Sequence, residues 1–303
     1  MGSRKIISFD WAIKTILRDK ANFGILEGFL QALLKQKIKI DALVESESNQ
    51  NNKNMKYNRV DLLAVDSNGE HIIIEVQYAP ENSYFKRLLY GTSKDIVDNI
   101  TVGEDYSHVK KVYSVSLVYF DVESPGKSSK DYVYYGKTEF FGLHSGKKVN
   151  IDSKFLDGLK EHADQDVNIF PEYYIISLDI FDDNINDSLD EWAYSFKHHE
   201  VKDSFTSIGI KEMSQKLDYI SMDTKIQRQY DKYLMDLASE RGTFGFATEK
   251  GRAEGHAKGH AEGRLKEKIE SLKKIFDMGL SIEQASQITG LSVAEIKELG
   301  VGF

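Results

Sequence analysis

Two short apolar segments joined by a tight turn form the clearest pattern of hydrophobic and polar positions in the chain. Residues 59–66 and residues 70–77 are both rich in aliphatic and β-branched side chains, which is typical of β-strands. A three-residue loop ending in Gly69 would join them, with the glycine in the left-handed conformation that such loops require. The pattern predicts an antiparallel hairpin in which Asp61 lies directly opposite Glu75.

These two acidic residues occupy positions where a strand would favour an apolar side chain. Directly opposed residues share one face of the sheet, with Cβ atoms roughly 4.5–5.5 Å apart. Two ionised carboxylates that close repel each other unless a cation lies between them. Oxygen ligands at this spacing suit Mg²⁺ or Mn²⁺, so we interpret Asp61 and Glu75 as a metal site. The alternative is a hairpin whose polar face points at water, and a register shifted by one residue would separate the two carboxylates.

A helix is predicted upstream, from Phe23 to about Gln36, with Asn22 as its N-cap. Glu27 lies on the wide apolar stripe of this helix. A buried carboxylate needs a cation or a set of hydrogen-bond donors. The alternative places Glu27 at the edge of the stripe, where it reaches solvent or a lysine.

A second helix is predicted downstream of the hairpin, over residues 83–99. Arg87, Tyr90 and Lys94 are spaced to share one face of it, and Lys86 lies beside them. This face is a candidate contact for the phosphates of a nucleic acid. The alternative is an ordinary solvated basic face.

The remainder of the first 240 residues alternates between strand and helix patterns, which favours an α/β domain with a mixed sheet flanked by helices. A capping box over residues 188–191 opens one of the helices. The expected strands are residues 112–120, 132–143 and 173–181, and the expected helices are residues 188–199 and 210–240.

From Gly251 to Gly263 a glycine recurs at every fourth position. Each glycine inside a helix costs about 1 kcal/mol relative to alanine, so this segment either packs closely against another helix or is a linker that orders on self-association. His256 and His260 have a spacing that chelates metals, but a third ligand is not evident, so we do not assign a metal to them.

Two further capping boxes follow, at residues 281–284 and 292–295. They predict two short helices joined by a glycine-containing turn, as in a helix-turn-helix. The second helix carries Glu295 and Glu298, which suit protein contact better than the major groove of DNA.

Composition limits the remaining possibilities. The 303 residues include no cysteine, which excludes disulfides, thiolate zinc sites and cysteine nucleophiles and fits a cytoplasmic location. No apolar run approaches the ~18 residues of a membrane span, so no membrane partner is expected. The net charge of −8 argues mildly against tight DNA binding. However, residues 1–120 carry 16 basic and 15 acidic side chains, so the acidic excess lies outside the segment with the proposed site.

The set Asp61 and Glu75-Val76-Gln77 resembles the PD-(D/E)XK nuclease superfamily. More narrowly, the chain is similar to the PD-(D/E)XK nuclease family transposases, also called recombination-promoting nucleases. The resemblance spans most of the chain: it begins at Phe9-Asp10-Trp11-Ala12-Ile13-Lys14 and Leu26-Glu27-Gly28-Phe29-Leu30-Gln31-Ala32-Leu33-Leu34, and continues through Arg87-Leu88-Leu89-Tyr90 to the glycine-rich tail.

This resemblance implies a restriction-endonuclease-like core and a Mg²⁺- or Mn²⁺-dependent DNA endonuclease linked to transposition or recombination. It implies Asp61 and Glu75 as metal ligands, Glu27 as a further ligand, and the backbone carbonyl of Val76 as part of the shell. Gln77 stands where the superfamily usually has lysine, and an uncharged amide cannot act as a base. The resemblance also favours a substrate role for Arg87 and Tyr90.

The expected organisation is a nuclease-like domain at 1–240, a glycine-repeat linker or self-association segment at 241–264, and a small helical tail at 265–303. Two other functions stay open. One is a nuclease-fold module with little or no turnover that binds nucleic acid or protein, favoured by Gln77 and by the net acidity. The other is an assembly protein that forms a homo-oligomer through its tail.

Overall fold

The computed structural model describes residues 3–15, 17, 19–44, 61–100, 103–123, 131–149, 168–218 and 222–300. The start of the first predicted strand, at residues 59 and 60, lies outside this part of the chain. The chain divides into two compact units, Met1–Asp236 and Leu237–Phe303.

A mixed six-stranded sheet forms the centre of the first unit, as the alternating strand and helix patterns predict. Its strand order is β2-β3-β4-β5-β7-β6, and β4, β5 and β7 run parallel to one another. The remaining neighbours pair antiparallel. A separate two-stranded sheet joins β1 to β8. The strands are β1 (Ser3–Lys5), β2 (Ile40–Val44), β3 (Leu62–Asp66), β4 (His71–Gln77), β5 (Val112–Val118), β6 (Val133–Gly136), β7 (Glu172–Ser177) and β8 (Glu200–Lys202).

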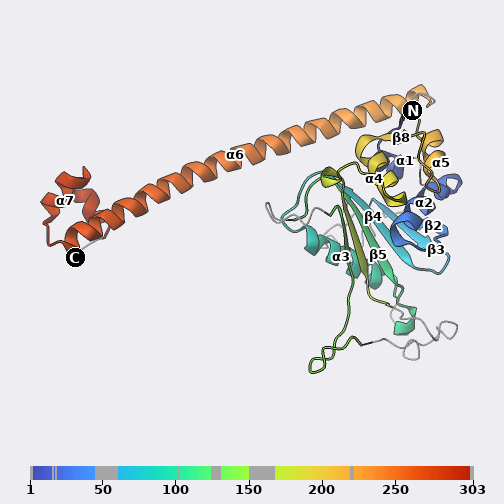
Figure 1. Ribbon diagram of the computed structural model, residues 1–303, viewed down its shortest axis with the longest axis horizontal. Coiled ribbons are helices and arrows are strands. Elements are labelled where there is room, and N and C mark those ends of the chain that lie inside the picture. The colour runs from blue at the N-terminus through green and yellow to red at the C-terminus, as the bar shows by residue number, and fades with distance from the viewer. Residues whose placement is uncertain are drawn as a thin grey trace. The chain divides into compact units, whose positions relative to one another are not determined.

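Helices cover both faces of the large sheet (Figure 1). One face packs on the main core together with α1, α2, α4 and α5, and the other packs on α3. Because side chains alternate along a strand, Val115 and Leu117 of β5 enter the main core while Val118 contacts the α3 side. The helices of this unit are α1 (Phe9–Thr15), α2 (Phe23–Leu34), α3 (Tyr84–Asp98), α4 (Ser188–His198) and α5 (Ile210–Lys216), with 3-10 turns at Lys20–Asn22, Tyr106–His108 and Leu178–Ile180.

The β3–β4 hairpin has the predicted register. Leu62 pairs with Ile74, and Asp66 donates its backbone N–H to the carbonyl of Glu70 across a three-residue loop. Gly69 has φ of 74°, the left-handed conformation that the loop requires. The predicted pairing of Asp61 with Glu75 continues this register by one residue.

Several predicted boundaries move in the structure. The α4 capping box is built one residue earlier, by Asp187 and Asp190, because Glu191 instead accepts hydrogen bonds from the distant residues Thr206 and Ser207. Asn22 precedes α2, as predicted, but its side chain makes no capping hydrogen bond. The strands expected at 112–120, 132–143 and 173–181 are shorter in the structure, and the helix expected at 210–240 is interrupted between α5 and α6.

The glycine repeat lies inside α6 (Thr224–Asp277), a helix that begins in the first unit and continues into the second. Within the first unit, the Tyr230 hydroxyl of α6 accepts a hydrogen bond from the Ser8 N–H at 2.8 Å. In the second unit, α6, α7 (Ile282–Thr289) and α8 (Val293–Glu298) enclose a small core around Leu272 and Ile296. Both predicted capping boxes, at Ser281 and Ser292, are present. Among the described residues, no helix combines the length and the apolar character needed to cross a bilayer.

Candidate active site

The structure brings Asp61 and Glu75 together at the open end of the hairpin. Asp61 immediately precedes β3, and its Oδ2 accepts a hydrogen bond from the Val76 N–H at 2.8 Å. Burial raises the pKa of the Glu75 carboxyl, Arg87 lowers it, and the negative charge of Asp61 raises it further. In an antiparallel pair the N–H and C=O of one residue point at the same neighbouring strand, so the carbonyl of Val76 lies on the Asp61 side.

Glu75 is a buried carboxylate with incomplete compensation. Its side chain is 8% exposed, and its Oε1 lies 3.6 Å from a guanidinium nitrogen of Arg87. Its Oε2 is buried and accepts no hydrogen bond from the described residues. Burial raises the pKa of Glu75, Arg87 lowers it, and Asp61 raises it further. The carboxylate is therefore held in a state that an additional cation would stabilise.

Further buried polar groups lie on the same face of the sheet. The amide nitrogen of Gln77 donates to the carbonyl of Ala79 at 2.9 Å. The Oε1 of Gln77 is buried and accepts no hydrogen bond from the described residues. Ser116 is directly opposite Glu75 in β5 and interacts with the Tyr84 hydroxyl. Burial raises the pKa of Tyr84 to about 12, against the lowering effect of Ser116 and with a further contribution from the Glu75 charge. Unsatisfied buried polar groups are rare in proteins, so the orphaned oxygens of Glu75 and Gln77 together mark a place for an ion, water or substrate.

These groups fit a small divalent cation. Among the described residues, no three acidic or histidine side chains converge as a ready-made metal site. Mg²⁺, however, commonly uses only one or two carboxylates and fills its other positions with water and substrate phosphate oxygens. The carboxylates of Asp61 and Glu75, the latter with its orphaned Oε2, and the backbone carbonyl of Val76 match this requirement.

Glu27 is not brought to this pair. Its Oε1 accepts a hydrogen bond from the Ile40 N–H at 2.9 Å, and the Lys39 ammonium lies 3.1 Å from the same oxygen. Ile40 pairs with Asp66, at the closed end of the hairpin. Asp61 is five residues away along β3, or about 16 Å at the usual rise of a strand. Glu27 is therefore a structural carboxylate, satisfied by the start of β2.

The candidate nucleic-acid contacts on α3 divide into two kinds. Arg87 lies at the site, between Glu75 and Glu81, 3.6 Å and 3.4 Å from their carboxylate oxygens. Lys94 forms an ion pair with Asp98 one turn further on, at 2.6 Å. Lys86 is exposed and Tyr90 is 37% exposed on the same helix. Of this set, the structure places only Arg87 against a candidate metal ligand.

Two residues around Glu75 were missed from the sequence, Ser116 and Tyr84. A serine at the centre of a wholly buried strand was a usable signal, because such a hydroxyl needs a partner. The adjacency of β5 to β4, which brings Ser116 to the site, is not readable from either segment alone.

Asp10 in α1 is another acid that the sequence interpretation left unassigned. It is 1% exposed, and it interacts with the hydroxyl of Tyr78, the residue after Gln77. Burial raises the pKa of Tyr78, and the neighbouring Tyr119 and Asp10 raise it further. Asp10 lies within the motif that begins at Phe9, and this position was the signal by which the sequence could have singled it out.

A sheet of this order, with paired acids on adjacent strands and a basic side chain from the following helix, defines a nuclease-like α/β core. The family model of the PD-(D/E)XK nuclease family transposases matches residues 7–240, and the chain belongs to this family. Its nuclease class and its link to transposition follow from that membership. No curated protein and no solved structure matches the chain.

Proposed function

We propose that this protein is a Mg²⁺- or Mn²⁺-dependent DNA endonuclease that hydrolyses phosphodiester bonds during transposition or recombination. The observation that carries the proposal is the juxtaposition of Asp61 with Glu75, whose buried Oε2 accepts no hydrogen bond within the part of the chain that the structure describes. The family model supports the nuclease class, and the charges around Glu75 support the metal.

Asp61, Glu75 and the carbonyl of Val76 would hold the ion. When bound, a divalent cation supplies an activated water and stabilises the charge that develops on a phosphate. A bound cation would offset the free-energy cost of burying the Glu75 carboxylate. The folded protein would therefore be more stable with the ion bound.

Gln77 would hold the attacking water. Its Nε2 is committed to the Ala79 carbonyl, so its Oε1 is the atom left to accept a hydrogen bond from that water. Because an amide takes up no proton, the proton released by the water leaves to solvent.

Arg87 would bind the substrate phosphate. Its guanidinium is now shared between Glu75 and Glu81, and a phosphodiester offers two oxygens to the same bidentate donor. Lys86, Tyr90 and Lys94, further along the same helix, are proposed to contact the flanking backbone.

The test is cleavage of plasmid DNA with Mg²⁺ and with Mn²⁺, each repeated with excess chelator. We expect cleavage only with the free metal, and its loss in Asp61→Asn and in Glu75→Gln. Asp41→Asn, an exposed acid on the neighbouring strand β2, is the matched control and should retain activity. Cleavage that persists in chelator, or in both site variants, would contradict the proposal.

A second candidate function is a nuclease-fold module that binds nucleic acid or protein with little turnover. Gln77 in place of lysine and the net charge of −8 favour it. Titration calorimetry with Mn²⁺ separates the two candidates. Metal binding that Glu75→Gln abolishes, without cleavage of any DNA substrate, favours the module.

Self-association through α6 is a further part of the proposed function. Among the residues that the structure describes, no atom lies within 4 Å of a Cβ built at Gly251, Gly255, Gly259 or Gly263, so these positions leave room for close approach by a second helix. Close packing would offset the roughly 1 kcal/mol that each interior glycine costs. Light scattering should show an oligomer that Gly255→Leu with Gly259→Leu converts to a monomer. A monomeric wild type, or an oligomer insensitive to both changes, removes this role.

A further inference from the structure

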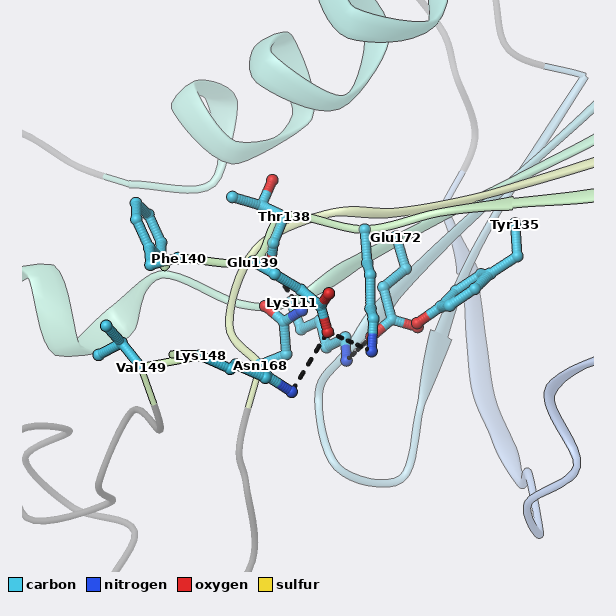
Figure 2. A pocket seen from close by; sticks show the side chains of 10 residues that line it. Lys111, Tyr135, Thr138, Glu139, Phe140, Lys148, Val149, Asn168 and Glu172 are labelled. Atoms are coloured by element: carbon cyan, nitrogen blue, oxygen red, sulfur yellow. Dashed lines mark hydrogen bonds and ion pairs between the residues drawn. The ribbon is translucent and has the colours of Figure 1, made fainter. Parts of the chain in front are cut away.

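A cavity of about 160 Å³ is lined by residues of β6 and of the segment that follows it (Figure 2). Its charged side chains are paired with one another. Lys111 lies 2.6 Å from Glu172, and Lys137 lies 2.8 Å from Glu139. Glu139 also contacts Lys148, at 3.2 Å. These contacts are internal ion pairs, so the cavity gives no reason to infer a charged ligand.

Two histidines of α6, His256 and His260, contact each other. Their ring centroids are 4.4 Å apart, with an angle of 69° between the ring planes. Both side chains are exposed, and α6 runs without a break through this segment (Figure 1). Histidines four residues apart share one face of a helix, and at this spacing two imidazoles can hold one metal ion. The sequence left the pair unassigned because a third ligand was not evident, and a second copy of the chain can supply the missing ligands.

The two histidines flank the face through which the second copy is proposed to pack. Each directly follows a glycine of the repeat, Gly255 or Gly259, and so lies about 100° around the helix from the glycine face. Among the described residues, no atom lies within 4 Å of a Cβ built at either glycine. When two helices approach closely at such a face, the side chains on its flanks are the next to meet.

The other flank of the glycine face indicates how the second copy is oriented. Its charged side chains are between 65% and 79% exposed and form only loose pairs along their own helix, at 3.9 Å. Their order along the chain, read in reverse, alternates in the opposite sense, so an antiparallel copy brings unlike charges level with one another. A twofold axis perpendicular to the helices also makes each flank meet the same flank of the other copy. The charged row is Lys250, Glu254, Lys258 and Glu262.

The three rows of this segment have nearly the same centre. The charged row is centred at position 256, the glycines at position 257 and the two histidines at position 258. Centres two residues apart are about 3 Å apart along a helix. One twofold axis near position 257 therefore brings glycine against glycine, pairs the charges, and gathers the histidines of both copies on one flank.

We propose that His256 and His260 of two antiparallel copies together hold one Zn²⁺, which joins the two chains. Zn²⁺ is usually four-coordinate and tetrahedral and accepts imidazole nitrogens, whereas Mg²⁺ prefers oxygen ligands. Arg252 and Arg264, at the two ends of the histidine row, oppose a cation, but both are exposed, so water and salt screen their charges. The inference rests on the proposed self-association through α6 and adds the ion and the antiparallel orientation.

The experiment is calorimetric titration of Zn²⁺ into the full-length protein that carries Glu75→Gln, which removes a competing carboxylate. We expect one ion for every two chains. His256→Gln and His260→Gln should each weaken binding by more than about 100-fold, because even an outer partner of a metal-bound histidine is worth roughly 10–100-fold. His144→Gln, at an exposed histidine of the first unit, is the matched control and should leave the affinity unchanged.

Two further measurements test the geometry and the assembly. Co²⁺ in place of Zn²⁺ should give the intense visible absorption of tetrahedral coordination, and both histidine variants should lose it. Light scattering should show that Zn²⁺ increases the fraction of dimer at low protein concentration and that a chelator reverses this effect. Gly255→Leu with Gly259→Leu should remove both the dimer and the tight binding of Zn²⁺.

Absence of tight Zn²⁺ binding, or binding that survives in both histidine variants, overturns the proposal. One ion per chain, with an affinity that the two glycine changes leave unaltered, also overturns it, because the pair would then act alone on a single helix.

Failure of the zinc site is distinguishable from failure of the self-association. A dimer that the glycine changes break, but that Zn²⁺ does not strengthen, removes only the zinc site. A chain that stays monomeric at every Zn²⁺ concentration removes both.

Discussion

The two ends of the β3–β4 hairpin both contain buried acidic side chains, yet they differ in how those charges are satisfied. At the closed end, Asp66 accepts hydrogen bonds from the backbone N–H groups of Asn68 and Glu70, and Glu27 accepts one from Ile40. At the open end, Asp61 accepts one from Val76, and Glu75 keeps a buried oxygen with no donor among the described residues.

This difference separates two uses of a buried charge. A carboxylate that ends with a full set of donors stabilises the fold and gains nothing from a ligand. A carboxylate that remains under-compensated costs stability until something binds, which is a property of functional sites. Burial and residue type alone, which Glu27 and Glu75 share, do not distinguish the two.

The largest expected effect is the loss of catalysis at the open end. Asp61→Asn and Glu75→Gln each remove a charge from the proposed ion while conserving shape, so cleavage of plasmid DNA should fall by more than about a hundredfold. The rate is measured at saturating Mg²⁺ on variants whose folding is checked by circular dichroism. A loss below tenfold in both variants would contradict the assignment of a catalytic site to the open end of the hairpin.

The same substitution gives a pH-dependent readout of stability. Because the folded protein raises the pKa of Glu75, the carboxyl binds its proton more tightly in the folded state than in the unfolded state. Wild-type stability should therefore fall, relative to Glu75→Gln, as the pH rises from about 4 through the raised pKa. Metal-free thermal melts of the two proteins across this range are the measurement. A Glu75→Gln variant that is less stable than wild type at neutral pH would show that Glu75 is satisfied in the fold.

The next largest effect is expected at the closed end of the hairpin, on the free energy of unfolding. Glu27→Ala leaves the N–H of Ile40 and the ammonium of Lys39 without their partner, which should lower the free energy of unfolding by about 2 kcal/mol. Activity per folded molecule should stay within about twofold of wild type, because no proposed catalytic group is touched. Urea unfolding and the plasmid assay together measure both quantities. Stability that is retained while activity is lost would reverse the assignment.

A smaller loss is expected at the turn that sets the register. Gly69 has φ of 74°, and a Cβ there would meet the side chain of Lys110 at 3.6 Å, an ordinary contact. The cost of Gly69→Ala is therefore backbone strain alone, about 1–2 kcal/mol of unfolding free energy. Thermal unfolding measures it. A neutral result would mean that the loop can adopt another conformation.

The smallest effect is expected for Arg87→Gln. DNA binding, measured by fluorescence anisotropy with metal present in the inactive Asp61→Asn background, should weaken about 5-fold. The salt dependence of binding should decrease by about one phosphate contact. An unchanged salt slope would remove Arg87 from the substrate contacts and leave it a partner of Glu75 alone.

The elements that were predictable from the sequence are those whose determinants are local. Gly69 fixes the loop length, and loop length fixes the pairing of Asp61 with Glu75. The capping boxes at Ser281 and Ser292 are likewise local, because the N-cap residue and its partner lie within four consecutive residues. Helix α3 follows from its own periodicity, within one residue at each end.

What the sequence could not supply depends on distant partners. The role of Glu27 is decided by Ile40, which is brought to it by the pairing of β2 with β3. Ser116 joins the site only because β5 lies beside β4. The α4 cap moved for the same reason, since Glu191 is taken by Thr206 and Ser207.

The shared position of Arg87 has a thermodynamic consequence. While the guanidinium neutralises Glu75, it competes with any cation for the same carboxylate, and Glu75 competes with any phosphate for the same guanidinium. A phosphate that withdraws Arg87 therefore increases the affinity of Glu75 for a cation, and by linkage the cation must tighten the phosphate by an equal factor. The enzyme we propose would load its ion and its DNA cooperatively and would hold either one poorly without the other.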